Sequence, residues 1–587
     1  MSSLEKRQEE SLPLTSSLPP QPAKTSRPSI KSLVAHFSLL AALVYLTLPY
    51  LSNIVPSSGC HSTPKYDAAT LEGAKCPHQP KALNVGTDWD PLTDKIYGEL
   101  AAKRLSKAVQ INTESYDNFP KNASDPVFDK HYAFAHFIEN EYTKLYTDIK
   151  HETVNVHGHL FTWEGSNKSL KPILLMAHID TVPVLPATLD QWTYPPFEGT
   201  VTHDATPETP GTWVWGRGSS DCKNSLLGIY GAVERLITEG FQPERTIIIA
   251  NGFDEEIGGF RGAGALAKTL YDRYGDNGIS FLVDEGFTGL SEEYGSLVAS
   301  FGMAEKGAVN VAVKVETLGG HSSVPPPHTA IGITSLLLAE LEAHPFKPAL
   351  DPAAPYLKYL NCLSDYAPEF PKALKGDVKN PRKWKKLARE LAGSSRILNS
   401  FLSTTQAIDL ISGGVKVNAL PEVVEATVNY RISFTSSVNE TISHVAKVLK
   451  PLAKDLGFTI SAFESDADSI ANKGNSTSHI TLTVPGGTGL EPAPITSATS
   501  EHFELLAGTA KHVFGEKTIV SPSGMFANTD TRHFWNLTEG LYRFTPALVS
   551  ENLNQHTVDE RISLEGHLNT TRFFYKLIRN SEGWQAE

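Results

Sequence analysis

Short apolar runs that lead into metal-binding side chains are the feature that most constrains the fold of this chain. The side chains concerned are His178, Asp180, Asp221, Glu255, Glu256 and Asp284. Strands of an open α/β sheet bind ligands at their carboxyl ends, so residues that follow several such strands are expected to gather there. Carboxylates and imidazoles in one place suit a pair of divalent cations such as zinc. The pattern therefore predicts a metal-dependent hydrolase on an α/β framework.

Predicted strands and helices alternate through the first half of the chain. We expect strands at 153–163, 172–179, 245–251 and 279–284, and helices at 94–109, 127–148, 222–239 and 262–274. This alternation predicts a mixed sheet flanked by helices. After residue 303 the order becomes β-α-β-β-α-β, which is typical of a ferredoxin-like α+β unit. We expect a lid domain at 304–465, with 345–400 as its elaboration, inserted between the catalytic halves 94–303 and 466–587.

Residues 33–51 form an almost unbroken apolar stretch. As a helix they would be about 28 Å long, which matches the hydrocarbon thickness of a bilayer. Lysines and arginines precede the stretch, whereas the first cation beyond it is Lys65. The positive-inside rule then predicts a single-pass type II anchor with a cytosolic tail (1–32), a lumenal stalk (52–93) and a lumenal catalytic body. A cleaved signal peptide fits poorly, because no Ala-x-Ala site follows.

Glycosylation motifs agree with a lumenal body. The acceptors are Asn122, Asn167, Asn439, Asn475, Asn536 and Asn569. The four cysteines exclude a disulfide scaffold and a CxxC metal site. Cys60 and Cys76 could pair in an oxidising lumen, and an unpaired state is equally compatible. Cys222 is interpreted as a small buried residue rather than a nucleophile, because no thiol-enzyme context accompanies it.

The formal charge of −13 excludes nucleic acid as a partner. A non-catalytic, membrane-anchored binding protein stays open as an alternative, but it would have no need of a complete set of ligands.

Seven short motifs occur in order over about two thirds of the chain. They are Ala177-His-Ile-Asp-Thr-Val-Pro183, Trp215-Gly-Arg-Gly-Ser-Ser-Asp-Cys-Lys223, Asp254-Glu-Glu-Ile-Gly-Gly259, Asp284-Glu-Gly286, Gly319-Gly-His-Ser-Ser323, Gly413-Gly-Val-Lys-Val-Asn-Ala-Leu-Pro421 with Arg431, and Asn554-Gln-His-Thr-Val-Asp-Glu560. Together they resemble the di-zinc aminoacylase/carboxypeptidase family of metallopeptidases. The resemblance implies a zinc-exopeptidase fold with two Zn²⁺ per chain.

The resemblance also supplies the ligand set, which spacing alone leaves open. It implies that Asp221 bridges the two metals, that His178 and Asp284 complete one site, and that Glu256 and His556 complete the other. His533 is the rival of His556, and the family pattern favours His556. A cis peptide after Asp221 is implied in the same way.

Catalytic roles follow from the same comparison. Asp180, two residues from His178 on one face of a strand, would orient the imidazole. Glu255 would act as general base for a metal-bridging hydroxide that attacks the scissile carbonyl. His321 would stabilise the oxyanion after domain closure, from its own chain or from a second subunit.

Asn418 and Arg431 resemble residues that hold the free carboxylate of the substrate. The vacuolar carboxypeptidases of the family imply release of C-terminal residues from small peptides, glycine at the penultimate position, and residence in the vacuole membrane. An N-acyl-amino-acid amidohydrolase stays open, since it needs the same metals and the same carboxylate site. A homodimer is also left open.

Overall fold

The computed structural model describes residues 66–84, 86, 89–204, 206, 209–286, 289–474 and 476–586. The predicted tail and membrane anchor lie outside these residues, as do Cys60 and Asn475. Within the described part of the chain, no helix has the length and apolarity needed to cross a membrane.

A nine-stranded mixed sheet forms the framework of the catalytic domain. Its strands follow the order β1-β2-β6-β3-β7-β18-β9-β17, and β8 pairs with β9. The bounds are β1 Lys150–Val154, β2 Gly158–Trp163, β3 Ile173–Met176, β6 Ile247–Asn251, β7 Phe281–Asp284, β8 Leu290–Glu293, β9 Ser296–Glu305, β17 Ile519–Met525 and β18 Leu541–Arg543. At the centre, β3 pairs in parallel with both β6 and β7, so the carboxyl ends of these three strands meet at one edge.

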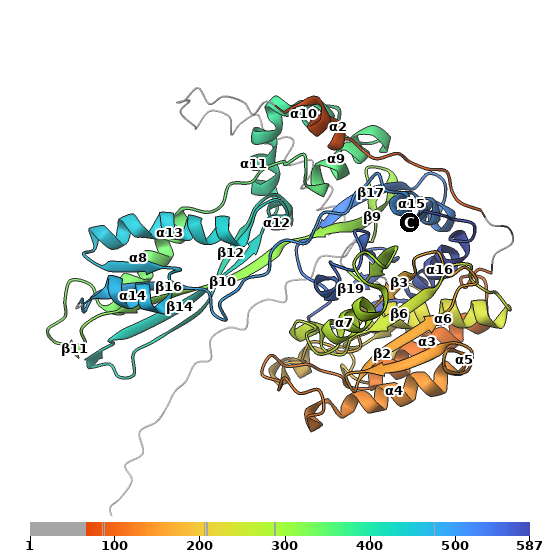
Figure 1. Ribbon diagram of the computed structural model, residues 1–587, viewed down its shortest axis with the longest axis horizontal. Coiled ribbons are helices and arrows are strands. Elements are labelled where there is room, and N and C mark those ends of the chain that lie inside the picture. Colours follow the sequence, from red (N-terminus) through yellow and green to blue (C-terminus); the bar gives the residue numbers. More distant parts are fainter. Residues whose placement is uncertain are drawn as a thin grey trace, which may run out of the picture. The chain divides into compact units, whose positions relative to one another are not determined.

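Helices cover both faces of this sheet, and α6 and α7 lie on opposite sides of β6 (Figure 1). Ile173 and Leu175 of β3 belong to the core on one face, whereas Leu174 and Met176 belong to the core under α7. The helices are α3 Lys95–Gln110, α4 Lys130–Glu141, α5 Thr143–Thr147, α6 Lys223–Thr238, α7 Ala263–Tyr274, α15 Glu501–Phe514 and α16 Leu564–Asn580. Burial on both faces explains why the strands are unbroken apolar runs and not alternating patterns. The predicted mixed α/β fold is confirmed.

A second, four-stranded sheet joins segments that are far apart in the sequence. Its order is β19-β20-β5-β4, with β20 antiparallel to β5. The bounds are β4 Val201–His203, β5 Thr212–Trp215, β19 Asn552–Leu553 and β20 Arg561–Ser563. This pairing brings the stretch around residue 556 next to the stretch around residue 221.

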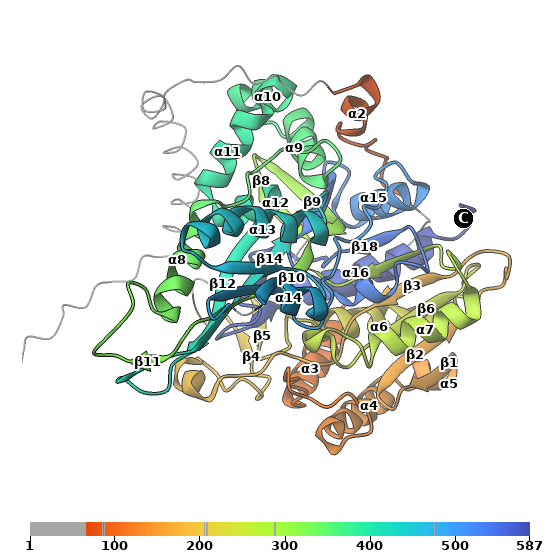
Figure 2. The same ribbon diagram turned by 60° about the vertical axis from the view of Figure 1, so that its left-hand side comes forward.

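The inserted region contains a five-stranded sheet in the order β12-β14-β10-β16-β15. Its elements are β10 Gly307–Glu316, α8 Ala330–Ala343, β12 Thr405–Gly413, β14 Val423–Ile432, α13 Val438–Asp455, β15 Thr459–Ala462, α14 Asp466–Lys473 and β16 His479–Thr483. Helices α8 and α13 contact each other across one face of this sheet (Figure 2), where alternate residues of β10 and β14 form the core. Strand β16 inserts between β10 and β15, so the sheet extends beyond the expected end at 465.

The helices between β10 and β12 pack in an unexpected place. They are α9 Pro355–Tyr366, α10 Lys372–Val378, α11 Trp384–Ser394 and α12 Arg396–Leu402. We expected an elaboration of the lid, but α9 contacts β17, and its core includes Val298 and Ile519 of the catalytic sheet. The apolar faces of these short helices fit either domain, and only the tertiary structure shows which edge they cover.

The described part of the expected stalk also packs against the body. Helix α2 (Ala68–Gly73) leads to Cys76, which forms a disulfide with Cys362 of α9, so the Cys60–Cys76 pairing is wrong. Gln79 exchanges hydrogen bonds with the backbone of Val520.

The glycosylation acceptors differ in accessibility. Asn122, Asn439 and Asn536 are exposed, and Asn167 is half-buried. Asn569 is only 7% exposed on α16, so the folded core has no room for a glycan there and we no longer expect one.

Candidate metal centre and active site

Three parallel strands deliver acidic and imidazole side chains to the same edge of the catalytic sheet. His178 lies two residues beyond β3, and Asp284 is the last residue of β7. Glu255 and Glu256 open the short helix η3 (Glu255–Ile257), which follows β6. Since β3 pairs with β6 on one side and with β7 on the other, these side chains converge.

The loop that carries Asp221 is fixed by a buried carboxylate, Glu560. The backbone N–H groups of Gly218, Ser220 and Asp221 each donate to Glu560 Oε1 at 3.0 Å, and Arg217 pairs with Oε2. Because Glu560 immediately precedes β20, the β5–β20 pairing sets this loop against the segment that carries His556. The Asp221–Cys222 peptide is cis, as the resemblance implied.

Asp221 lies between two histidines and faces each with a different oxygen. His178 Nε2 is 3.2 Å from Asp221 Oδ1, and His556 Nε2 is 3.0 Å from Asp221 Oδ2. His556 Nε2 also lies 3.3 Å from Glu256 Oε2. One carboxylate between two imidazoles is the arrangement expected of a bridging metal ligand.

Three overlapping groups of side chains each bring their donor atoms within 4.8 Å of one another. The groups are His178–Asp221–Cys222, His178–Glu255–Glu256 and Asp221–Glu256–His556. Nitrogen and carboxylate oxygen donors in such groups suit zinc. The residues present therefore fit a pair of divalent cations.

Asp284 lies outside these groups but carries an unsatisfied buried atom. Its Oδ1 accepts a hydrogen bond from the Glu285 N–H at 2.9 Å, while its buried Oδ2 has no hydrogen-bond partner among the described residues. Burial raises the pKa of Asp284 to about 6. A buried carboxylate oxygen without a partner is costly, and a bound cation would remove that cost.

The pKa values show how much negative charge is concentrated here. Burial raises the pKa of Glu255 well above its usual value, and the neighbouring Glu256 raises it further. Burial together with Asp221 raises the pKa of Glu256 to about 7. Hydrogen bonds to Asp221 and Glu256 raise the pKa of His556 to about 11. So many buried carboxylates in one place need compensating positive charge, and the donor set would obtain it from a pair of divalent cations.

Asp180 positions its neighbours through both carboxylate oxygens. The N–H groups of Glu255 and Glu256 donate to Oδ1 and Oδ2 at 3.0 and 3.2 Å. His178 Nδ1 lies 3.4 Å from Asp180 Oδ1 and 2.9 Å from the Asp180 carbonyl oxygen. Asp180 thus fixes the imidazole and the start of η3 at the same time.

The structure separates the two rival histidines. His556 joins the donor cluster, whereas His533 Nε2 lies 2.9 Å from the Gly258 carbonyl oxygen and belongs to none of the three groups found among the described residues. Cys222 is fully buried, and burial raises the pKa of its thiol well above the usual value. Its Sγ accepts a hydrogen bond from the His178 N–H, which suits a packing role.

The expected residues of the inserted domain lie elsewhere. His321 on β11 (Gly320–His321) is exposed and lies 2.7 Å from the Ser323 hydroxyl. β11 pairs with β13 (Ala419–Leu420), so Asn418 lies beside it. No hydrogen bond or ion pair of the described residues joins His321 or the Asn418 side chain to the donor cluster. Arg431, by contrast, reaches the catalytic domain and donates to Asn528 Oδ1 at 2.9 Å.

Sequence reasoning missed three acids around the cluster: the half-buried Glu285 and the buried Asp530 and Glu560. Burial raises the pKa of Glu285 well above its usual value, and Asp221 and Asp284 raise it further. Glu285 and Glu560 lie inside motifs that carry the resemblance, so their position was a signal. Asp530 had a weaker sequence signal, because it only lies three residues before His533.

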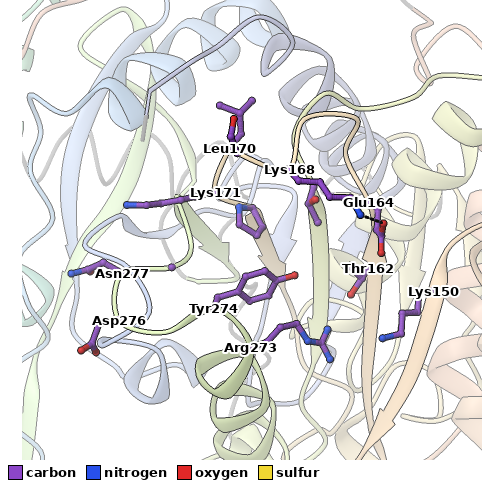
Figure 3. A pocket seen from close by; sticks show the side chains of 14 residues that line it. Lys150, Thr162, Glu164, Lys168, Leu170, Lys171, Arg273, Tyr274, Asp276 and Asn277 are labelled. Carbon is purple, nitrogen blue, oxygen red and sulfur yellow. Dashed lines mark ion pairs between the residues drawn. The ribbon is translucent and has the colours of Figure 1, made fainter.

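A surface pocket of about 550 Å³ is a separate feature (Figure 3). It is lined by residues such as Lys150, Glu164, Lys168 and Arg273, and by none of the expected site residues. Lys168 pairs with Glu164, and Arg273 with Glu152. Its cations are thus largely neutralised by their own neighbours.

An α/β sheet with imidazoles and carboxylates gathered at its strand ends defines a class of protein, the metal-dependent hydrolases. The family model for peptidase family M20/M25/M40 matches residues 174–580, and the chain belongs to this family. The predicted resemblance is confirmed, and the protein is a peptidase.

Relatives and solved structures agree with this assignment. Carboxypeptidase S of Saccharomyces cerevisiae is 37% identical and covers 93% of this chain and 96% of its own length. An N-fatty-acyl-amino acid synthase/hydrolase of Mus musculus is 30% identical, and the match covers 88% of this chain and 94% of that protein. Human carnosine dipeptidase 1 shares the fold with a TM-score of 0.55 at 13% identity, covering 83% of this chain and 96% of its own. The M20 metallo-carboxypeptidase Sso-CP2 of Sulfolobus solfataricus shares the fold with a TM-score of 0.52 at 16% identity. The match covers 82% of this chain and 98% of that one.

Proposed function

We propose that this protein is a zinc-dependent metallocarboxypeptidase that releases C-terminal amino acids from small peptides, with a preference for glycine at the penultimate position. The observation that carries the proposal is the position of Asp221 between His178 and His556, with Glu255 Oε2 only 4.0 Å from His178 Nε2. The similarity to Carboxypeptidase S supports the substrate class.

Five side chains would hold the metal pair. Asp221 would be shared by the two ions, His178 and Asp284 would help to hold one, and Glu256 and His556 the other. When bound, two zinc ions acidify a water molecule and polarise the scissile carbonyl. The chain itself supplies the geometry, because Asp180 and Glu560 hold the ligand-bearing segments by buried hydrogen bonds.

Glu255 would move the proton. Its carboxylate stands next to the donor cluster, its backbone N–H is fixed by Asp180, and its surroundings favour the protonated form. A carboxylate of raised pKa can accept a proton from the attacking water and return it to the departing amine.

The inserted domain would complete the site. Arg431 and Asn418 would bind the carboxylate of the substrate, and His321 would stabilise the oxyanion. Because His321 and Asn418 are exposed at the β11–β13 ribbon, either closure of the inserted domain or a second copy of the chain must bring them to the substrate. Exposed valines around them, including Val415 at 99% and Val417 at 98%, would suit contact with a second copy.

A vacuolar location would follow from the similarity to Carboxypeptidase S and from the expected anchor at 33–51. The accessible acceptors Asn122, Asn439 and Asn536 would carry glycans in a lumenal body.

The test replaces the proposed base. Glu255→Gln should lower kcat by about 10²–10⁴-fold, because an amide of the same shape cannot accept the proton. Glu342→Gln, an exposed change on α8, is the matched control and should leave kcat unchanged. Metal content by elemental analysis and thermal unfolding should stay near wild type in both. Full turnover by Glu255→Gln would refute the assigned base.

Hydrolysis of N-acyl amino acids is a second candidate, favoured by the similarity to the N-fatty-acyl-amino acid synthase/hydrolase. The two functions share the metals and the carboxylate site and differ only on the acyl side. Parallel kcat/KM measurements on glycyl dipeptides and on N-fatty-acyl amino acids should show a clear preference for one class.

A further inference from the structure

Arg532 has a position that neither the metal centre nor the expected substrate site explains. It belongs to η5 (Asp530–His533). His533 of η5 lies 2.9 Å from the carbonyl oxygen of Gly258, the residue that caps the end of η3. Its guanidinium lies over the ring of Phe260 at 5.1 Å. A Cβ atom at Gly258 would come within 3.8 Å of Arg532 Nη1. The guanidinium is therefore held at the rim of the acidic cluster.

The charge of Arg532 is not neutralised by a direct partner. Among the described carboxylates, none lies within 4.0 Å of its nitrogens, although Asp530 and Glu255 are near enough to act on it electrostatically. The side chain is only half-buried, so the guanidinium keeps access to solvent and to a ligand. An arginine next to acids usually forms an ion pair, and this one leaves its donors unused.

Arg431 approaches the same place from the inserted domain. It donates to Asn528 Oδ1, and Asn528 in turn donates to the Lys306 carbonyl oxygen at 2.6 Å. Asn528 lies four residues before Arg532 on the same loop. Arg431 also lacks a carboxylate within 4.0 Å in the described part of the chain. The positive charge of Arg532 adds to burial in lowering the pKa of Arg431. Together with the hydrogen bond from Arg431 to Asn528, this puts the two arginines in one neighbourhood.

Two neighbouring cations that no described carboxylate pairs directly are well suited to bind an anion between them. The reaction provides one, because the substrate of a carboxypeptidase or of an N-acyl-amino-acid hydrolase ends in a carboxylate. We propose that Arg532 binds the carboxylate of the substrate together with Arg431, one arginine from each domain. This inference rests on the proposed function and adds a specificity-determining residue to it.

The pair would select substrates by their free C-terminus. Arginine matches a carboxylate with two parallel hydrogen bonds, and each guanidinium can engage one edge of the anion. Phe260, with 64% of its surface exposed, would keep the Arg532 plane in place. Since Arg532 is fixed to η3, the carboxylate would be held at a set distance from Glu255, and cleavage would fall on the last peptide bond.

The experiment compares a glycyl dipeptide with its C-terminal amide. Arg532→Met should raise KM for the dipeptide by roughly 10- to 100-fold, the loss expected for a charge-assisted hydrogen bond, with kcat changed much less. The preference of kcat/KM for acid over amide should fall by the same factor. Arg532→Lys should recover part of this preference, because the lysine ammonium keeps the positive charge but cannot form the two parallel hydrogen bonds of a guanidinium. Arg396→Met, an exposed change on α12, is the matched control.

A role limited to balancing the acidic cluster predicts a different result. In that case both substrates would lose activity by the same factor, and the acid-to-amide preference would be unchanged in Arg532→Met, which would overturn the proposal. Calorimetric binding of a free amino acid and its amide to Glu255→Gln, with and without Arg532→Met, gives a readout that needs no turnover. If the wild-type protein cleaved neither substrate class, the proposed function would fail, while the binding difference would still decide the role of Arg532.

Discussion

The strand-end cluster and the β11–β13 ribbon differ in how completely each is assembled. In the cluster, His178 and Asp221 are 1% and 7% exposed, and hydrogen bonds already connect them to each other and to Asp180 and Glu560. At the ribbon, His321 is exposed and its ring contacts Ser323, a neighbour in its own loop. Backbone pairing builds the first region, whereas the second makes no described contact with it. Under the proposed function, the metal ligands would be assembled in advance, and the substrate contacts would be added by motion or by a partner.

The largest effect should come from removing the metals. A chelator should abolish hydrolysis, and Zn²⁺ should restore it in the wild type but not in His178→Ala, because that variant loses a buried ligand. His344→Ala, a change at the end of α8, should behave as the wild type. Activity assays with elemental analysis provide the measurement. Hydrolysis that survives complete metal removal would contradict the proposal that the strand-end cluster binds the catalytic metals.

A smaller effect is expected at the ribbon. His321→Ala should lower kcat by about 10²–10³-fold, the range for one oxyanion donor, with metal content and thermal stability unchanged because the side chain is exposed. His328→Ala, a nearby exposed change, is the control. Steady-state kinetics and elemental analysis on the same preparations provide the check. Loss of metal from His321→Ala would mean that the ribbon belongs to the preassembled site.

Mixing His321→Ala with Glu255→Gln sharpens this result. If His321 acts across a subunit interface, mixed dimers should regain part of the wild-type activity. If it acts within one chain, the mixture should stay as inactive as its components.

The smallest effect should come from Glu560, which contacts the Asp221 loop and is not one of the proposed metal ligands. Glu560→Gln removes half of an acceptor set that serves three N–H groups and Arg217, so Asp221 should be held less firmly. We expect metal affinity to fall by about 10–100-fold, the range for residues that support ligands. Glu551→Gln is a matched control in the same region. Zinc titration with a competing chelator measures the change, and an unaltered affinity would show that Asp221 is positioned without Glu560.

Most of the catalytic domain followed from the sequence. Strands 245–251 and 279–284 and helices 222–239 and 262–274 lie within two residues of the observed bounds, because long apolar runs and amphipathic stretches specify them locally. The helix expected at 127–148 is broken at Tyr142 into α4 and α5. The division into domains was predicted less well. β16 lies in the region assigned to the second catalytic half but joins the lid sheet, and α9 lies in the region assigned to the lid but packs on the catalytic sheet.

The order of apolar runs and the acids that follow them determined, without coordinates, that strands would bring candidate ligands to one edge of a mixed sheet. Only the tertiary structure decided that Asp221 faces both His178 and His556, that Glu560 holds its loop, and that Arg431 reaches the loop that leads to Arg532. The physical reason is the sequence distance over which each kind of interaction acts. Hydrophobic periodicity acts over a few residues and can be read directly, whereas these contacts join segments between 43 and 342 residues apart and depend on how the sheets pair.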